Sequence, residues 1–151
     1  VARLADDTEH LFATEAPCIV ITEVNSNNFL VSGEAVYLVD WEKAVTSPRY
    51  QDLGHFLVET TTRWKTDYVF SDEARMRFLE AYRRHMVNPI PLEELSEKTK
   101  VLENTILLRA LSWCYMAYYE YTQTDRPIQN QDTFRKISQY LDESEWLLTV
   151  A

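Results

Sequence analysis

Two patterns of apolar residues divide this chain near Pro48. Before it, residues 18–22 and 28–32 are short runs rich in Ile, Val, Leu and Phe, which is typical of strands. A third apolar run, 36–40, follows after a tight turn that contains glycine. The pattern therefore predicts a β-hairpin over residues 28–40.

Beyond Pro48 the apolar residues recur at helical spacing. Asp52 is placed to cap a helix that runs through residues 53–64, and the consecutive threonines 60–62 are expected to end it. The second half of the segment 92–122 is apolar nearly all round, which predicts a buried central helix. The other predicted helices span 3–13, the segment from Ser71 to a residue before Asn88, 92–122 as one helix or two abutting ones, and 131–148. The expected fold is mainly α with a small β-hairpin (α+β), in a single domain over 1–151.

Composition is that of a packed globule, with 151 residues of which 46% are apolar. No apolar run is as long as a membrane span, and the chain does not begin with a basic segment and a signal-type core. We expect a cytoplasmic protein. Because the first residue is Val rather than Met, we also expect a fragment of a longer protein or a processed chain.

The balance of charge narrows the class of partner. A net charge of −9 argues against nucleic acid and against anionic membranes, since both attract basic surfaces. It is compatible with a cationic small molecule, although solubility alone also explains it. Cys18 and Cys114 lie far apart in apolar surroundings, which favours free thiols, and no zinc-type spacing occurs.

Three polar residues around the predicted hairpin suggest a chemistry. Glu23 stands five positions before Asn28, and Asp40 ends the returning strand. Amide and carboxylate oxygens are hard ligands that suit magnesium rather than zinc. A carboxylate base, then a metal-binding Asn, a hairpin and a metal-binding Asp is the arrangement of kinase phosphoryl transfer. Asn25 and Asn27, in the same loop, favour a role as turn formers.

The segments "EVNSNNFLV", "VYLVDWEKA" and "QDLGHFL" occur in an order that resembles the C-terminal lobe of the aminoglycoside phosphotransferase and choline kinase-like family. The resemblance is tight over residues 18–57 and rests only on the helix pattern over 58–151. It implies a protein-kinase-like fold. It also implies Mg²⁺ and ATP as cofactors, and a small hydroxylated acceptor.

The resemblance also implies roles for individual residues. Asn28 and Asp40 correspond to the magnesium ligands, and Glu23 stands where the catalytic base is found. Asp52 corresponds to a buried Asp that braces the catalytic loop through hydrogen bonds to its backbone amides. Glu42 would lie on the substrate side of the cleft.

The sequence departs from the family pattern at two loop positions. The usual His is Ile21, and the usual Asp is Glu23, whose carboxylate is displaced by about 1 Å unless the loop compensates. Only two glycines are present, so the chain has no glycine-rich phosphate loop. We therefore expect the nucleotide-binding N-terminal lobe to be absent from this chain and to be its partner.

Two features in the helices have competing interpretations. His55 favours a hydrogen-bonded core histidine over an acid–base group. Aromatic residues in the long helix favour core packing over a cation–π cage, in which Glu120 and Glu42 would add negative charge. The residues concerned are Trp113, Tyr115, Tyr118, Tyr119 and Tyr121.

Three hypotheses follow. The first is the catalytic and acceptor-binding lobe of a Mg–ATP phosphotransferase that acts on an alcohol. The second, favoured by Ile21 and Glu23, is a pseudokinase or interaction module that keeps the fold without catalysis. The third is a helical scaffold in which Glu23, Asn28 and Asp40 do not share a common point. The identity of the acceptor and the oligomeric state do not follow from the sequence.

Overall fold

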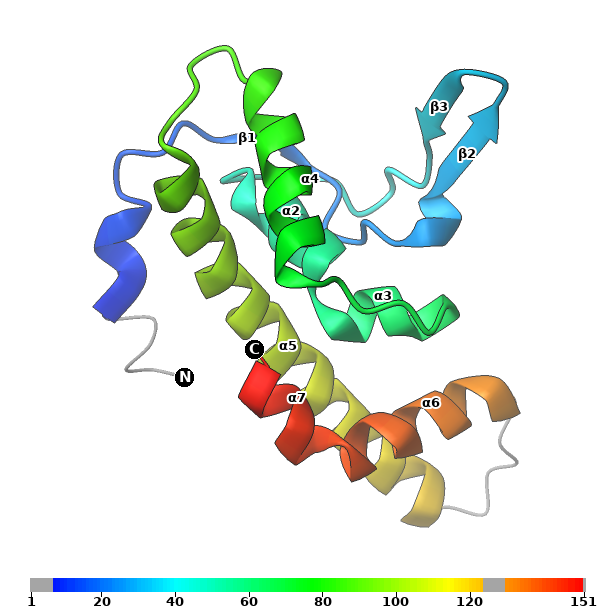
Figure 1. The fold of residues 1–151 in the computed structure, drawn as a ribbon. Helices are drawn as coiled ribbons and strands as arrows, with labels where there is room; N and C mark the ends of the chain where they lie inside the picture. Colours follow the sequence, from blue (N-terminus) through cyan, green and yellow to red (C-terminus); the bar gives the residue numbers. More distant parts are fainter. Residues whose placement is uncertain (1–6, 124–129, 151) are drawn as a thin grey trace.

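The computed structural model describes residues 7–123 and 130–150 (Figure 1). Most of these residues are helical, and the strands form two small antiparallel pairs. The predicted α+β class is therefore confirmed. Of the predicted helix 3–13, positions 3–6 lie outside the described residues, and the described part includes a 3-10 turn, η1, at Glu9–Leu11.

The strands frame the segment that carries the candidate chemistry. β1 (Cys18–Val20) pairs with β4 (Val45–Ser47), and between them β2 (Phe29–Ser32) and β3 (Ala35–Leu38) form the hairpin, which projects away from the helices (Figure 1). Gly33, the first of its two loop residues, has φ +60°, a conformation that glycine adopts without steric cost. The predicted hairpin is confirmed.

The helix expected over residues 53–64 is two helices, α2 (Tyr50–Leu57) and α3 (Glu59–Lys65). Val58 separates them because its backbone is extended, with ψ 139°. The consecutive threonines lie inside α3 and do not end it, so that prediction is wrong. Asp52 lies in the first turn of α2, where its carboxylate binds another segment instead of capping the helix.

The remaining helices follow the predicted order with one further division. Ser71 caps α4 (Asp72–Arg84) as predicted, because its Oγ accepts a hydrogen bond from the Ala74 amide. The segment predicted over 92–122 is one helix of 32 residues. The helix predicted over 131–148 divides at Glu143, outside both flanking helices. The elements are α4 (Asp72–Arg84), α5 (Leu92–Gln123), α6 (Gln131–Asp142) and α7 (Ser144–Val150).

Helix α5 runs diagonally through the molecule and joins two apolar clusters (Figure 1). Its first half packs with α2 and α4 around Leu53, Leu79 and Leu95, which are buried. Its second half packs with α6 and α7 around Leu107 and Ile137. α2 approaches α5 closely, and this contact sets the position of the candidate site over α5.

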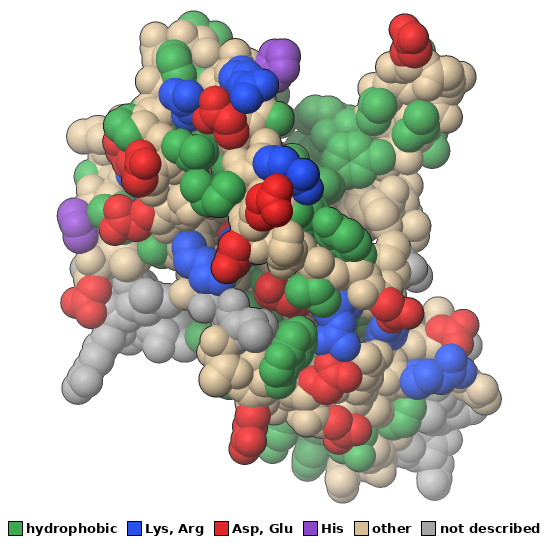
Figure 2. Space-filling view, viewed as in Figure 1, with side chains coloured by type: hydrophobic (Ala, Val, Ile, Leu, Met, Phe, Trp, Pro, Cys, Tyr) green, Lys and Arg blue, Asp and Glu red, His purple; other side chains and the backbone are tan. Residues whose placement is uncertain are grey.

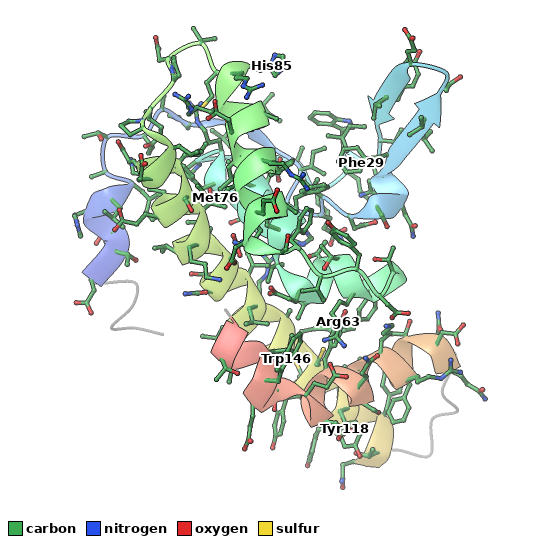
Figure 3. The ribbon with its side chains drawn as sticks, viewed as in Figure 1. Phe29, Arg63, Met76, His85, Tyr118 and Trp146 are labelled. Atoms are coloured by element: carbon green, nitrogen blue, oxygen red, sulfur yellow. The ribbon has the colours of Figure 1, made fainter. Side chains whose placement is uncertain are left out.

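The second half of α5 is not buried all round. Cys114 and Ala117 face the core, whereas Tyr115 and Tyr119 are 69% and 59% exposed. Tyr118 lies near α6 (Figure 3), where its ring stacks on Phe134 with centroids 5.7 Å apart. The prediction of a buried helix is wrong for this half, because only one of its faces packs against α6 and α7.

The predicted packing of the aromatic cluster in the core is likewise wrong for most of its members. Tyr121 alone among them is partly buried against the core, and the exposed members are Trp113, Tyr115, Tyr118 and Tyr119. No helix within the described residues combines the length and the apolar character needed to cross a membrane.

Candidate active site

The loop that follows β1 and begins at Ile21 is bound to α2 by hydrogen bonds. The Asp52 carboxylate accepts hydrogen bonds from the Ile21 amide, at 2.8 and 3.1 Å, and from the Thr22 amide at 2.8 Å. This is the brace that the family resemblance implies for Asp52. Ile21, where the family has His, is 1% exposed. Its side chain therefore packs in the interior and offers no polar group to the loop.

One residue at the start of the loop and one at the end of the hairpin have strained backbone conformations. Thr22 has φ 66° and Asp40 has φ 68°, and both lie in the left-handed region that residues with a side chain seldom adopt. Such conformations persist where the surrounding structure over-determines them, and they concentrate at functional sites. Asp52 supplies that constraint at Thr22, through the hydrogen bond to its amide.

The Glu23 carbonyl organises the interior of the loop. It accepts hydrogen bonds from the Asn25 amide at 2.9 Å and from Asn28 Nδ2 at 2.8 Å. Asn25 Oδ1 in turn accepts from the Asn27 amide at 3.0 Å, a local turn within the short 3-10 helix η2 (Ser26–Asn28) and its cap. Asn28 is 6% exposed, so its orientation is fixed by burial as well as by this hydrogen bond.

A backbone contact brings the far strand of the hairpin to Asn28. The Val39 amide donates to the Asn28 carbonyl at 2.9 Å, and Asp40 is the next residue. Asp40 is exposed, and within the described residues no ion pair or hydrogen bond engages its carboxylate. Contacts therefore join Glu23, Asn28 and Val39, and the meeting of all three predicted side chains at a common point stays a prediction for Asp40.

These donors fit a magnesium ion held together with a nucleotide. Asn28 Nδ2 donates to the Glu23 carbonyl, so the amide oxygen is the atom that would bind a metal ion, and Asp40 would contribute a carboxylate. Magnesium in kinase sites takes one or two protein ligands together with substrate phosphates. In the described part of the chain, no three His, Cys, Asp or Glu side chains gather into a metal-binding group, so a cage made of such ligands alone is absent there.

Glu23 is engaged by a residue that the sequence did not single out. Lys43 Nζ lies 2.6 Å from Glu23 Oε1, and both side chains are partly exposed. The hydrogen bond and the charge of Glu23 raise the pKa of Lys43, so this lysine is a cation at neutral pH. Lys43 follows the hairpin by only a few residues, but nothing in its spacing indicates that it folds back over the loop.

Glu23 and Lys43 line one side of a cavity of about 580 Å³. The neighbouring Glu42 is exposed and is not among the described residues that line it, although the resemblance placed it on the substrate side. α5 contributes Arg109 and Trp113 to the same cavity. The residues that line it therefore come from segments far apart in the sequence.

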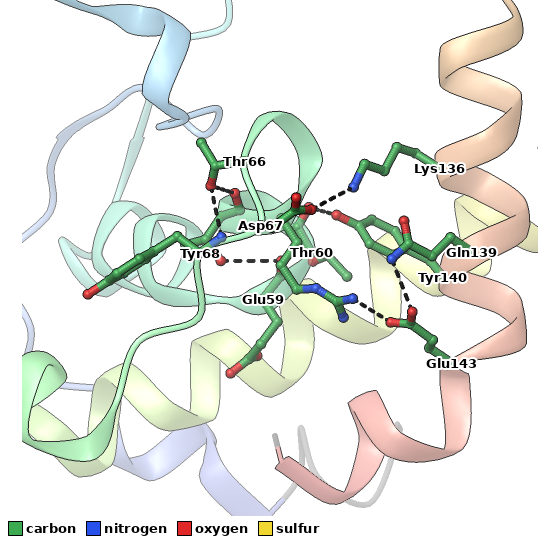
Figure 4. Close-up of polar contacts among 11 residues, drawn as sticks. Glu59, Thr60, Thr66, Asp67, Tyr68, Lys136, Gln139, Tyr140 and Glu143 are labelled. Carbon is green, nitrogen blue, oxygen red and sulfur yellow. Dashed lines mark hydrogen bonds and ion pairs between the residues drawn. The ribbon is translucent and has the colours of Figure 1, made fainter.

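Polar contacts join the floor of the cavity to α6 (Figure 4). The Tyr140 hydroxyl donates to the Thr60 carbonyl at 3.1 Å, and both residues line the cavity. On the same side of α3, Arg63 lies 2.6 Å from Glu143 and over the Trp146 ring at 5.0 Å (Figure 3). These contacts fix α3 against the C-terminal helices, so the shape of the cavity depends on all three elements.

His55 lies in the wall between the loop and α5. Its Nδ1 is 3.5 Å from the Val24 carbonyl and 3.4 Å from the Thr61 hydroxyl. Burial lowers the pKa of His55, and the charge of Arg109 acts in the same direction. The imidazole is therefore neutral at pH 7. Its contacts agree with a hydrogen-bonded structural histidine, but it also lines the cavity, which the sequence did not indicate.

Comparison with known proteins identifies the family. No curated protein matches the sequence of this chain. The sequence model of the phosphotransferase enzyme family (APH) matches residues 2–92, which is more than half of the 151 residues. The match includes Glu23, Asn28, Asp40 and Asp52, and it ends at the start of α5, before Arg109 and Trp113. The chain thus belongs to the phosphotransferase enzyme family, as its loop and hairpin indicate.

Proposed function

We propose that this chain is the catalytic and acceptor-binding lobe of a Mg–ATP-dependent phosphotransferase with a protein-kinase-like fold, which phosphorylates a hydroxyl group of a small molecule. The observation that carries the proposal is the position of Glu23. Its carboxylate lines a cavity large enough for a small acceptor, and its carbonyl binds the side chain of Asn28. The proposed base thus lines a substrate-sized cavity, and a proposed metal ligand is hydrogen-bonded to the backbone of that base.

In this proposal Glu23 accepts the proton of the acceptor hydroxyl. The acceptor oxygen then forms a bond to the terminal phosphorus of ATP while the bond to ADP breaks, so ADP is the leaving group. Asn28 and Asp40 would hold Mg²⁺, which supplies positive charge to the phosphate oxygens when bound. Asp52 acts through the loop, because it fixes the amides that precede Glu23.

The exposed hairpin supports a second lobe as partner. Leu30 and Tyr37 pair across the strands on one face, Val31 and Val36 pair on the other, and all four are between 53% and 72% exposed. Apolar side chains are visible on this projection in Figure 2. Contiguous exposed apolar residues on a strand pair mark a contact surface. We propose that a nucleotide-binding lobe covers this surface, and that the chain by itself does not transfer phosphate.

Two observations favour a second candidate, a pseudokinase or interaction module. The Glu23 carboxylate is held by Lys43, and Ile21 gives the loop no polar side chain. A base that stays in this ion pair would not accept a proton. In that case the fold would serve binding alone.

The test joins the chain to its nucleotide-binding lobe and follows ATP consumption by ³¹P NMR with magnesium and a panel of small alcohols. We expect phosphorylation of at least one alcohol, and a loss of about 100-fold or more in Asp40→Ala, because a charge on the metal is removed. Glu34→Ala, at the exposed tip of the same hairpin, is the matched control and keeps the activity.

Equal activity in Asp40→Ala and the parent protein would show that the metal assignment is wrong. Calorimetry with magnesium and ATP separates the two candidates further. No binding of nucleotide by the joined protein would favour the interaction module.

A further inference from the structure

The charges that line the cavity do not balance. Among the described lining residues, the ionisable side chains near neutral pH are Glu23, Lys43, His55 and Arg109. Lys43 is paired with Glu23 at 2.6 Å, so these two charges largely compensate each other. His55 is neutral at pH 7, since burial lowers its pKa. Arg109 is then the remaining charge.

Arg109 has no partner among the described residues that would neutralise its charge. It projects from α5 at an exposed position, and no ion pair or hydrogen bond of its guanidinium occurs within the described residues. Its field reaches across the cavity, because it contributes to lowering the pKa of His55 on α2. An unpaired guanidinium facing a cavity is a site for a planar anion, which it binds through two parallel hydrogen bonds.

This local charge is opposite to that of the whole protein. The net charge of −9 left a cationic acceptor open, with Glu120 and Glu42 as its partners. Neither residue is among the described residues that line the cavity, and Glu23 is the only carboxylate there. A cationic acceptor would meet Lys43 and Arg109 with one shared carboxylate to offset them, which is electrostatically unfavourable.

The rest of the cavity wall combines uncharged polar residues, among them Asn25 and Thr61, with apolar and aromatic ones. Trp64 and Trp113 meet edge to face, with centroids 6.1 Å apart, and both line the cavity. Cys114 lies beside them, and burial raises the pKa of its thiol to about 11, so it stays protonated. This wall accommodates an apolar or aromatic body, with no further charge.

We propose that the acceptor is a hydroxy acid, whose carboxylate is bound by Arg109 and whose apolar part lies against Trp64 and Trp113. The assignment rests on the proposed function for the reacting hydroxyl, which would lie toward Glu23. The binding of the acid itself requires neither nucleotide nor magnesium. It can therefore be measured separately from phosphate transfer.

The experiment compares three probes of similar shape by calorimetry on the 151-residue chain at low ionic strength. They are 3-phenyllactate, an anion; 3-phenylpropane-1,2-diol, which is neutral; and phenylalaninol, a cation. We expect 3-phenyllactate to bind at least about tenfold more tightly than the other two, as a charge-assisted pair implies. In Arg109→Gln this preference disappears, while Arg77→Gln, an exposed arginine on α4 that is absent from the cavity wall, keeps it.

Trp113→Ala tests the apolar wall, because it weakens all three probes to a similar degree and leaves the preference for the anion. Tighter binding of phenylalaninol, an unchanged preference in Arg109→Gln, or no binding of 3-phenyllactate up to its solubility would each overturn the proposal. So would displacement of 3-phenyllactate by inorganic phosphate at equal affinity, since Arg109 would then serve the transferred phosphoryl group.

The two proposals fail in different ways. Loss of phosphate transfer with the anion preference intact contradicts only the proposed function. Phosphate transfer to cationic alcohols, with no preference for the anion, contradicts only the assignment of the acceptor.

Discussion

The loop and hairpin between Ile21 and Lys43 differ sharply from the helical crossing of α2 and α5 beneath them. The loop and hairpin are largely exposed and contain two strained backbone positions. They are fixed by hydrogen bonds that the Asp52 carboxylate accepts and by one that the Asn28 side chain donates. The crossing is buried and is fixed by close packing of one backbone on another. The residues proposed for catalysis lie in the loop and hairpin, and the crossing of α2 and α5 determines their position.

The two glycines of the chain show this difference. Gly33, in the hairpin turn, has φ +60° and open space around it. Gly54, in α2, lies against α5, where an added Cβ would meet the Glu103 amide nitrogen at 2.9 Å. The first glycine is required by its conformation, and the second by the lack of space. The site therefore combines a locally determined turn with a helix position determined by tertiary contact.

The largest effect is expected from Asp52→Ala, which breaks the link between the two regions. The amides of Ile21 and Thr22 lose a charged acceptor, and Thr22 loses the contact that supports its strained backbone. We expect the free energy of unfolding to fall by about 3 kcal/mol, as measured by urea denaturation. Asp52→Asn, which keeps one acceptor oxygen, should lose about half as much. Equal stability of Asp52→Ala and the parent chain would contradict the role of Asp52 as a brace.

An alanine at each glycine sharpens the comparison. Gly54→Ala should reduce the free energy of unfolding by about 2 kcal/mol, because its Cβ meets the α5 backbone, which cannot move aside cheaply. Gly33→Ala should lose about 1 kcal/mol, because only the positive φ opposes the methyl group. Urea denaturation measures both variants. If Gly33→Ala lost more stability than Gly54→Ala, the contact of α2 with α5 would accommodate a methyl group more easily than the hairpin turn does.

The smallest effect concerns pH and His55, which lies between the two regions. The folded state lowers the pKa of His55, chiefly by burial, so its contribution to stability is complete above about pH 6.5 and is lost as the pH falls through the folded pKa. The charges that act on it are those of Arg109, Asp52 and Glu23. Between pH 7 and pH 5 the stability of the parent chain should therefore fall relative to that of His55→Gln. Parallel stability curves for the two proteins would contradict this assignment.

Local sequence was sufficient for several features. The hairpin over residues 28–40 and the start of α4 at Ser71 follow from short-range turn and capping preferences. The spacing of Asn28, Asp40 and Asp52 was enough to indicate the family. Each of these depends on residues that are near one another along the chain or that belong to one motif.

Other features escaped prediction because they depend on contacts between distant segments. The break at Val58 and the division at Glu143 carry no glycine or proline to signal them. The exposed aromatic face of α5 was predicted to be buried, because an apolar sequence does not indicate how many helices pack around it. For Asp52, local position indicated only a helix cap, and it was the family resemblance that implied the bond of its carboxylate to a loop 30 residues earlier.

The sequence by itself therefore determined the chemistry proposed for this chain, a base and metal ligands around a hairpin, because those residues lie within one short motif. Only the tertiary structure decided which other residues lie beside the proposed base and line the same cavity. Lys43 folds back onto Glu23, and α5 and α6 bring Arg109 and Tyr140 to the same cavity from positions more than 80 residues beyond the loop. No local preference encodes that meeting, which arises from the packing of α3, α5 and α6 into one wall.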